Sequence, residues 1–191
     1  MKLSTVRLLF FVLLISYEVS AQKYEREYRI QEMQVPEQAL QFVRESGFDR
    51  KIRWYAEEGW QRHSIEAKTR FNKHRYSIEF DTTGRLEDIE IVIDRRKLPA
   101  ATRQAILSKF ASDFEKFKII KIQIQYSGDP VALRQLTAKP FDTQNVIVKY
   151  ELIVKGRTSG KAHWYEYLFT DKGVAEHRTV SLFRNTDNLE Y

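Results

Sequence analysis

A hairpin that occurs twice constrains the fold of this chain more than any other feature of its sequence. The first copy, Tyr76–Ile93, reads YSIEFDTTGRLEDIEIVI, and the second, Tyr165–Leu182, reads YEYLFTDKGVAEHRTVSL. At an offset of 89 positions four pairs of identical residues coincide: Tyr76 and Tyr165, Phe80 and Phe169, Gly84 and Gly173, and Glu87 and Glu176. Each copy predicts a strand that ends at phenylalanine, a polar turn that ends in glycine, and a second strand.

The elements before the two hairpins recur as well. Pro36 and Pro99 each predict the start of a helix, because the first helical turn does not use the N–H that proline lacks. The first helix is expected to end at Gly47, and one apolar stripe marks the second: Ile106, Leu107, Phe110 and Phe114. Alternating segments precede the first hairpin at 51–57 and 65–71, and the second at 120–125 and 146–154. The order of elements is therefore a helix followed by four strands, twice.

This pattern predicts an α+β fold. Strict alternation gives each strand one apolar and one polar face, which is typical of an antiparallel sheet. We expect two tandem helix-plus-four-strand units that form an antiparallel sheet of about eight strands, with both helices packed on one face. The other face, which carries Glu66, Arg70, Glu79 and Asp88, is expected to be open to solvent and usable as a docking surface.

The two units differ in length. We expect the first repeat at residues 35–94 and the second at 95–183, with a leader at 22–34 and a polar tail at 184–191. The leader is expected to be flexible or to form an edge strand. The second repeat carries an insertion at 127–143, and two interpretations of it stay open. An insertion of this kind can add a function to a scaffold, or it can be a tolerated surface loop.

Residues 1–21 have the pattern of a secretory signal peptide. Lys2 and Arg7 precede an apolar run, Leu8–Ile15, and Ala21 offers a small residue at the cleavage site. The alternative, an uncleaved anchor, requires a longer apolar run to span a bilayer. Cleavage after Ala21 predicts a periplasmic or secreted protein with no integral membrane segment.

Charge and cysteine content exclude several classes of function. Without Lys2, Arg7 and Glu18 the chain has 30 basic and 25 acidic residues, and these alternate along the sequence. A nucleic-acid site would need the cations clustered on one element, so none is expected. The chain has no cysteine, which excludes disulfides, thiol catalysis and cysteine-ligated metals.

The repeated unit resembles a known family. The core IEAKTRFNKHRYSIEFDTTGRLEDIEIVID and the proline-initiated helix are similar to the secreted PepSY-like proteins of Bacteroidetes, which are described as similar to β-lactamase inhibitor proteins. The shared motif is a structural F-D-x-x-G-x-L-x-D hairpin, and the second copy departs from it at Val174 and Ala175. The resemblance implies a non-enzymatic binding role in the cell envelope.

No catalytic, metal-binding or cofactor-binding residue is predicted. The four histidines have no second ligand at a metal-like spacing on the same element. Asp88, Glu90 and Asp94 are interpreted as a solvated strand face. Ser159 and Ser181 lack the context of a nucleophile elbow. An enzyme would require clustered titratable groups with shifted pKa values in one cleft, and the sequence shows no such cluster.

The remaining candidates are residues for binding a protein partner. Tyr55, Trp60 and Trp164 lie where alternation does not demand burial, and these residue types dominate binding interfaces. Packing under the insertion would explain them equally well. With Arg70 and Glu79 they mark the face on which we expect an envelope protein to be bound or inhibited. The alternative is a carrier of a lipid or peptide, with a cavity between the helices and the sheet.

Overall fold

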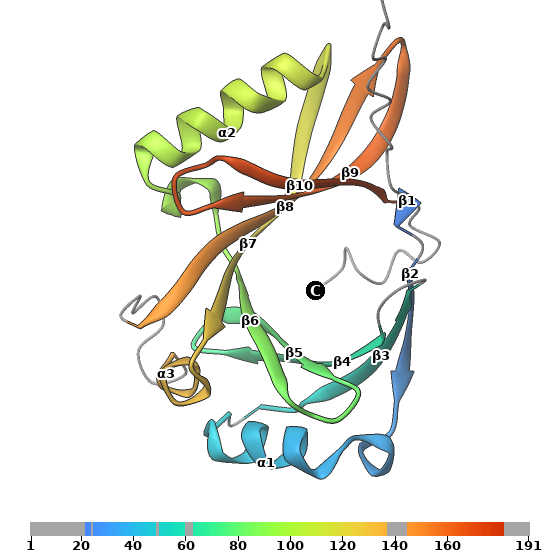
Figure 1. Cartoon of the computed structure of the whole chain (residues 1–191), viewed down its shortest axis with the longest axis vertical. Helices are drawn as coiled ribbons and strands as arrows, with labels where there is room; N and C mark the ends of the chain where they lie inside the picture. Colours follow the sequence, from blue (N-terminus) through green and yellow to red (C-terminus); the bar gives the residue numbers. More distant parts are fainter. Residues whose placement is uncertain (1–21, 24, 49, 60–62, 137–144, 182–191) are drawn as a thin grey trace, which may run out of the picture.

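The computed structural model describes residues 22–23, 25–48, 50–59, 63–136 and 145–181 (Figure 1). Three α-helices are present among them: α1 (Glu37–Glu45), α2 (Ala100–Asp113) and α3 (Pro130–Gln135). The strands are β1 (Gln22–Lys23), β2 (Glu25–Ile30), β3 (Arg53–Gly59), β4 (His63–Phe71), β5 (His74–Asp81), β6 (Leu86–Val92), β7 (Lys116–Gly128), β8 (Val146–Thr158), β9 (Lys161–Thr170) and β10 (Ala175–Ser181). Within these residues no helix is both long enough and apolar enough to cross a bilayer.

All the strands belong to one sheet. Its order is β1-β10-β9-β8-β7-β6-β5-β4-β3-β2, and every neighbouring pair is antiparallel except β1 and β10. The predicted α+β fold with an antiparallel sheet is confirmed. The sheet has ten strands rather than about eight, because the leader supplies β1 and the edge strand β2.

The sheet is strongly curled. β1 and β2 lie at opposite ends of the strand order, yet a single residue separates them in the chain. Two residues of extended chain span only about 7 Å, so the two edges must come close together. Figure 1 shows the resulting C-shaped section, with α1 and α2 on its outer side. We call the helix-covered side of the sheet the outer face and the opposite side the inner face.

Aromatic contacts hold both helices against the outer face. The ring centroids of Phe42 on α1 and Phe80 on β5 are 5.8 Å apart, and those of Phe110 on α2 and Phe169 on β9 are 5.6 Å apart. Phe80, Phe110 and Phe169 are fully buried. Each buried aromatic side chain removes a large apolar area from water, so these contacts anchor the two helices.

The tight turns of the two repeated hairpins have the same geometry. Gly84 and Gly173 both have left-handed backbone conformations, with φ of +88° and +81°. The backbone N–H of Gly84 donates to the carbonyl of Asp81, and that of Gly173 donates to the carbonyl of Thr170. A Cβ atom on Gly84 would lie 2.8 Å from Pro36 Cβ, and one on Gly173 would lie 2.8 Å from the carbonyl oxygen of Thr102. Each turn therefore packs closely against the start of a helix.

The first part of the predicted insertion is helical. Asp129 caps α3 by accepting a hydrogen bond from the backbone N–H of Val131 at 2.6 Å. Leu133 is fully buried, and Arg134 forms an ion pair with Glu45 of α1 at 2.8 Å. α3 thus fixes the second half of the chain against the first helix. Residues 137–143 of the insertion lie outside the described residues.

Candidate functional site

The inner face of the sheet is more enclosed than the sequence predicts. Glu66 and Asp88, expected to be open to solvent, are each only 8% exposed, and Glu90 is 4% exposed. The expectation of an open, solvated face is therefore wrong for these three residues. Alternation correctly assigns them to the polar side of the sheet, but the curl of the sheet brings inner-face side chains close together and removes water from them.

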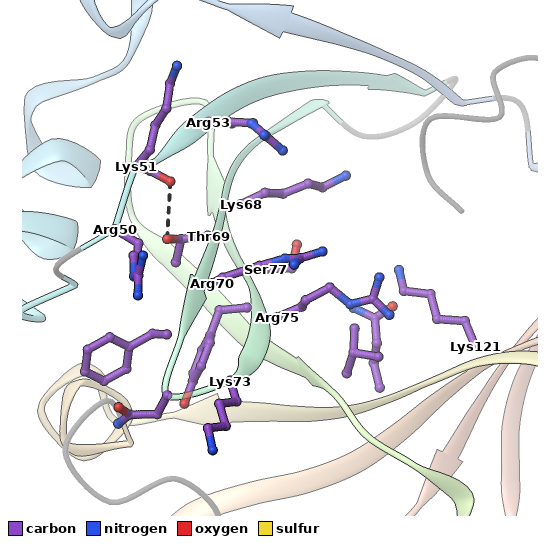
Figure 2. A pocket seen from close by; sticks show the side chains of 15 residues that line it. Arg50, Lys51, Arg53, Lys68, Thr69, Arg70, Lys73, Arg75, Ser77 and Lys121 are labelled. Carbon is purple, nitrogen blue, oxygen red and sulfur yellow. Dashed lines mark hydrogen bonds between the residues drawn. The ribbon is translucent and has the colours of Figure 1, made fainter. Parts of the chain in front are cut away.

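A basic cleft of about 900 Å³ lies at one end of the inner face and around the β4–β5 turn (Figure 2). Fifteen residues line it; none is acidic, and eight are arginines or lysines. These eight are Arg50, Lys51, Arg53, Lys68, Arg70, Lys73, Arg75 and Lys121. They come from the segment after α1, from β3, β4, β5 and β7, and from the β4–β5 turn. Basic and acidic residues are interspersed along the sequence, but the fold brings these eight basic side chains together in one cleft.

Within the cleft, cations face each other directly across neighbouring strands. Arg53 is opposite Lys68 in the β3–β4 register, and Arg70 is opposite Arg75 in the β4–β5 register. Like charges at directly opposed positions destabilise a sheet. Partial burial and the neighbouring charge of Arg70 lower the pKa of Arg75. A bound anion would relieve this repulsion.

Arg70 and Arg75 are available to an anion. Neither forms an ion pair with a carboxylate in the described part of the chain. Lys68 differs from them, because its Nζ lies 2.9 Å from Glu27 Oε2 and 3.0 Å from Glu66 Oε2. These two carboxylates raise the pKa of Lys68 despite its burial, so Lys68 stays charged and links the cleft to its acidic border.

An acidic cluster lies next to the basic cleft on the inner face. Carboxylate oxygens of Glu79, Asp88 and Glu90 lie within 4.8 Å of one another. The amide of Gln125 donates to Asp88 Oδ2 at 3.2 Å, and the amide of Gln123 donates to Glu90. Oxygen ligands at this spacing suit a hard cation, but the glutamine amides already stabilise the same carboxylates.

Burial shifts the protonation of these carboxyl groups. It raises the pKa of Glu66 to about 7, outweighing the favourable charge of Lys68. It also raises the pKa of Glu90, to which Glu151 and Asp88 add repulsion. The interpretation of Asp88, Glu90 and Asp94 as a solvated strand face is wrong for the first two residues. Asp94 alone is exposed, and it accepts a hydrogen bond from the backbone N–H of Arg96.

The sign of the charge changes along three adjacent strands of the inner face. An arginine and a glutamate stand four residues apart on each: Arg53 and Glu57 on β3, Arg70 and Glu66 on β4, and Arg75 and Glu79 on β5. Four residues of strand correspond to about 13 Å. The spacing is visible in the sequence, but its meaning depends on the strand register, which places the three arginines at one end of the face and the glutamates farther along it.

The structure separates the predicted partner-binding residues into four environments. Arg70 lines the basic cleft, and Glu79 belongs to the acidic cluster. Tyr55 is buried, with Lys68 Nζ 4.8 Å from its ring centre, so packing accounts for its position. Trp164 lies on β9, half-buried, with Lys155 Nζ 5.9 Å from its ring. Trp60 lies outside the described residues.

Comparison with known proteins identifies the fold but no family. No family model matches the sequence, and no curated protein matches it. A DUF2874 family protein from Bacteroides ovatus matches the structure with a TM-score of 0.51 and 10% identity, covering 76% of this chain and 87% of its own. A candidate periplasmic protein from Bacteroides eggerthii matches with a TM-score of 0.50 and 14% identity, covering 76% and 88%. A BLIP-like protein from Bacteroides fragilis has a TM-score of 0.48 at 13% identity, covering 80% and 90%.

Proposed function

We propose that this chain is an exported, non-catalytic protein that binds another envelope protein through the inner face of its sheet. The basic cleft is the observation that carries the proposal, because eight cationic side chains and no acidic one line a single cleft with a volume of about 900 Å³. Arginine is enriched at the centres of protein interfaces, where its planar guanidinium group can donate two parallel hydrogen bonds to one carboxylate. Arg70 and Glu79 remain the proposed contacts on this face, together with the half-buried Trp164 on β9, and Trp60 stays a predicted contact.

The signal-peptide pattern and the fold support the cellular setting of this proposal. Residues 1–21 predict export, and a protein of the same fold is described as a candidate periplasmic protein. We also propose that residues 35–94 and 95–183 are two tandem PepSY-like units, for which the matching turns at Gly84 and Gly173 are the support. Residues 22–34 then join the two edges of the sheet, and 184–191 follow it as a tail.

Charge reversal in the cleft tests the proposed function. The mature chain carrying Arg70→Glu and Arg75→Glu would be used to capture proteins from its own envelope fraction, with mass spectrometry as the readout. The matched control is Arg85→Glu with Lys172→Glu, which changes the net charge equally at the exposed hairpin turns. We expect one stoichiometric partner to be retained by the wild type and the control and lost by the cleft variant. Equal capture by all three proteins would contradict the proposal.

The carrier alternative stays a prediction. It requires an enclosed cavity between the helices and the sheet. The basic cleft and a second cleft beside it, which is lined by Arg75 and by residues 92–95 and 117–122, are formed by strands, turns and the segments beside them. None of their lining residues belongs to α1, α2 or α3. Native mass spectrometry of the purified chain would support a carrier if a lipid or peptide were retained in a fixed ratio.

The clustered carboxyl groups are the observation that favours an enzyme as a second candidate. Glu66 and Glu90 have raised pKa values, which is a property of general acids and bases. Their hydrogen-bond partners on the inner face are Ser77, Gln123 and Gln125, so a buried structural network explains the same shifts. Hydrolase substrates turned over by the wild type and not by Glu66→Gln would establish the enzymatic function.

A further inference from the structure

We infer that the inner face takes an extended polypeptide segment in which an acidic and a basic residue lie about four positions apart. The inference rests on the proposed function and specifies the chemistry of the segment. The acidic residue would lie between Arg70 and Arg75 in the basic cleft, and the basic residue would face the half-buried Glu79 farther along the same strand.

The basic cleft alone does not select among anions. The opposed pair Arg70 and Arg75 would hold a carboxylate, a phosphate or a sulfate equally well, because each presents oxygens to a guanidinium group. Lys73 and Lys121 add positive charge on the two sides of this pair. The selection among classes of ligand must therefore come from the residues beyond the cleft.

The adjoining carboxylates exclude a continuous polyanion. Glu66 and Glu79 stand directly opposite each other on β4 and β5, and Asp88 is opposite Glu79 on β6. A chain of phosphates or acidic sugars that continued from the cleft along these strands would meet this row. The repulsion would come from Glu79 and from Asp88, which is shielded from water, because the charge of Glu66 is offset by Lys68 at 3.0 Å. A ligand that follows the strands must therefore carry negative charge in the basic cleft and positive charge beside the carboxylates.

A polypeptide can meet this requirement at the right distance. Arg70 and Glu66, and likewise Arg75 and Glu79, are separated by four residues of strand, or about 13 Å. In an extended segment, side chains four positions apart lie on the same side at the same separation. An acidic and a basic residue at that spacing would therefore be matched at both ends by charges of opposite sign.

Three labelled peptides test this inference by fluorescence anisotropy on the mature chain. Each has about nine residues, mostly threonine and valine to favour extended conformations, and differs only at two positions four apart. These positions hold glutamate and lysine, two glutamates, or two lysines. We expect the mixed peptide to bind about tenfold more tightly than either of the others, since it alone gains contacts at both ends.

Neutral variants separate the two ends of the site. Arg70→Gln with Arg75→Gln should reduce the affinity for the mixed peptide to that for the two-lysine peptide. Glu79→Gln should reduce it to that for the two-glutamate peptide. The control Arg85→Gln with Lys172→Gln removes two exposed cations outside the cleft and should leave all three affinities unchanged. Thermal melting of each variant confirms that it is folded.

Several results would overturn the inference. They are equal affinities for the mixed and two-glutamate peptides, complete displacement of the mixed peptide by inorganic phosphate, or binding that requires removal of residues 184–191. In the last case this chain's own tail would be the occupant. If the charge-reversal variant loses its envelope partner while the peptides bind equally, the proposed function stands and this inference fails. If partner capture is unchanged, the proposed function itself fails.

Discussion

The two halves of the sheet repeat each other on the outer face and differ on the inner face. In both halves a glycine with positive φ packs against the start of a helix, at Gly84 and at Gly173. In both a buried phenylalanine, Phe80 or Phe169, contacts a helix. The inner face of the first half carries the basic cleft and acidic cluster, whereas on the inner face of the second half Ile153 is buried.

This difference shows that the fold restricts the residues of the outer face more than those of the inner face. A helix must cover an apolar face, so the residues that contact it are restricted in size and shape in both halves. The inner face has no helix to accommodate, and its side chains can vary in charge without disturbing the core. We therefore expect substitutions on the outer face to act on stability in both halves. Substitutions at the accessible inner-face positions of the first half, such as Arg70 and Arg75, should act on binding, whereas those at its buried carboxyl groups should also change stability.

The largest effect is expected from alanine at the two turn glycines. Gly84→Ala and Gly173→Ala should each lower the free energy of unfolding by about 3 kcal/mol, because a Cβ would meet the helix start and favour a different φ. Gly160→Ala is the control: it has φ of +76° but no atom within 4 Å of its Cβ position, so about 1 kcal/mol is expected. Urea denaturation measures all three. A mild effect at only one turn would show that the halves are not equivalent.

A smaller effect, confined to the first half, is expected from the buried carboxyl groups. The pKa of Glu66 is about 7 in the folded protein against 4.5 in the unfolded chain, so the folded state binds the proton more tightly. The free energy of unfolding should therefore fall as the pH rises from about 4.5 to about 7. Glu66→Gln should raise it at pH 8 by about 2 kcal/mol and change it little at pH 4.

Glu90→Gln should act in the same direction, because burial raises the pKa of Glu90 as well. The exposed Glu115, changed to Gln, is the control and should leave the pH profile unaltered. Chemical denaturation at several pH values measures the profile. A wild-type protein that gains stability between pH 5 and pH 8 would contradict the proposed burial of these charges.

The smallest effect concerns the two-residue turns between β4 and β5 and between β8 and β9. Both central residues of each turn have positive φ: Asn72 and Lys73 in the first, Ser159 and Gly160 in the second. Lysine disfavours this conformation, so Lys73→Gly should stabilise the fold by about 1 kcal/mol and weaken binding of anions in the cleft. Gly160→Lys should destabilise it by about the same amount.

Asn72→Gly serves as the control for these turn variants, because asparagine tolerates a positive φ better than lysine does. It should change stability only slightly. Thermal melts and phosphate titrations would show whether stability and anion binding change in opposite directions at Lys73. If Lys73→Gly left both unchanged, the lysine would have no role in the cleft.

The sequence predicted those parts of the fold that depend on local patterns. Alternation placed Ile78 and Phe80 on the buried side of a strand. Proline marked both helix starts, since Pro36 and Pro99 occupy the positions directly before α1 and α2. The pairing of β1 with β10 was not predictable, because a two-residue strand has no period and its partner is near the other end of the chain.

The candidate site was predicted only in part. Arg70 and Glu79 were assigned to the correct face from alternation alone. The burial of Tyr55, Asp88 and Glu90 was missed, because alternation shows on which side of a sheet a residue lies but not whether the sheet curls over that side. Nor could charges scattered over β3, β4, β5 and β7 be grouped into one cleft before the register of these strands was known.

The pairing of β1 with β10 has a consequence for how the chain folds. Gln22 is opposite Val180, so this contact joins residues near the two ends of the described chain. Such a contact has a high loop-closure cost and cannot form before the last strand has been synthesised. The meander from β2 to β9 can assemble earlier from neighbouring strands. We therefore expect the pairing of β1 with β10 to form last, so that the two edges of the sheet come together only after the other strands are in place.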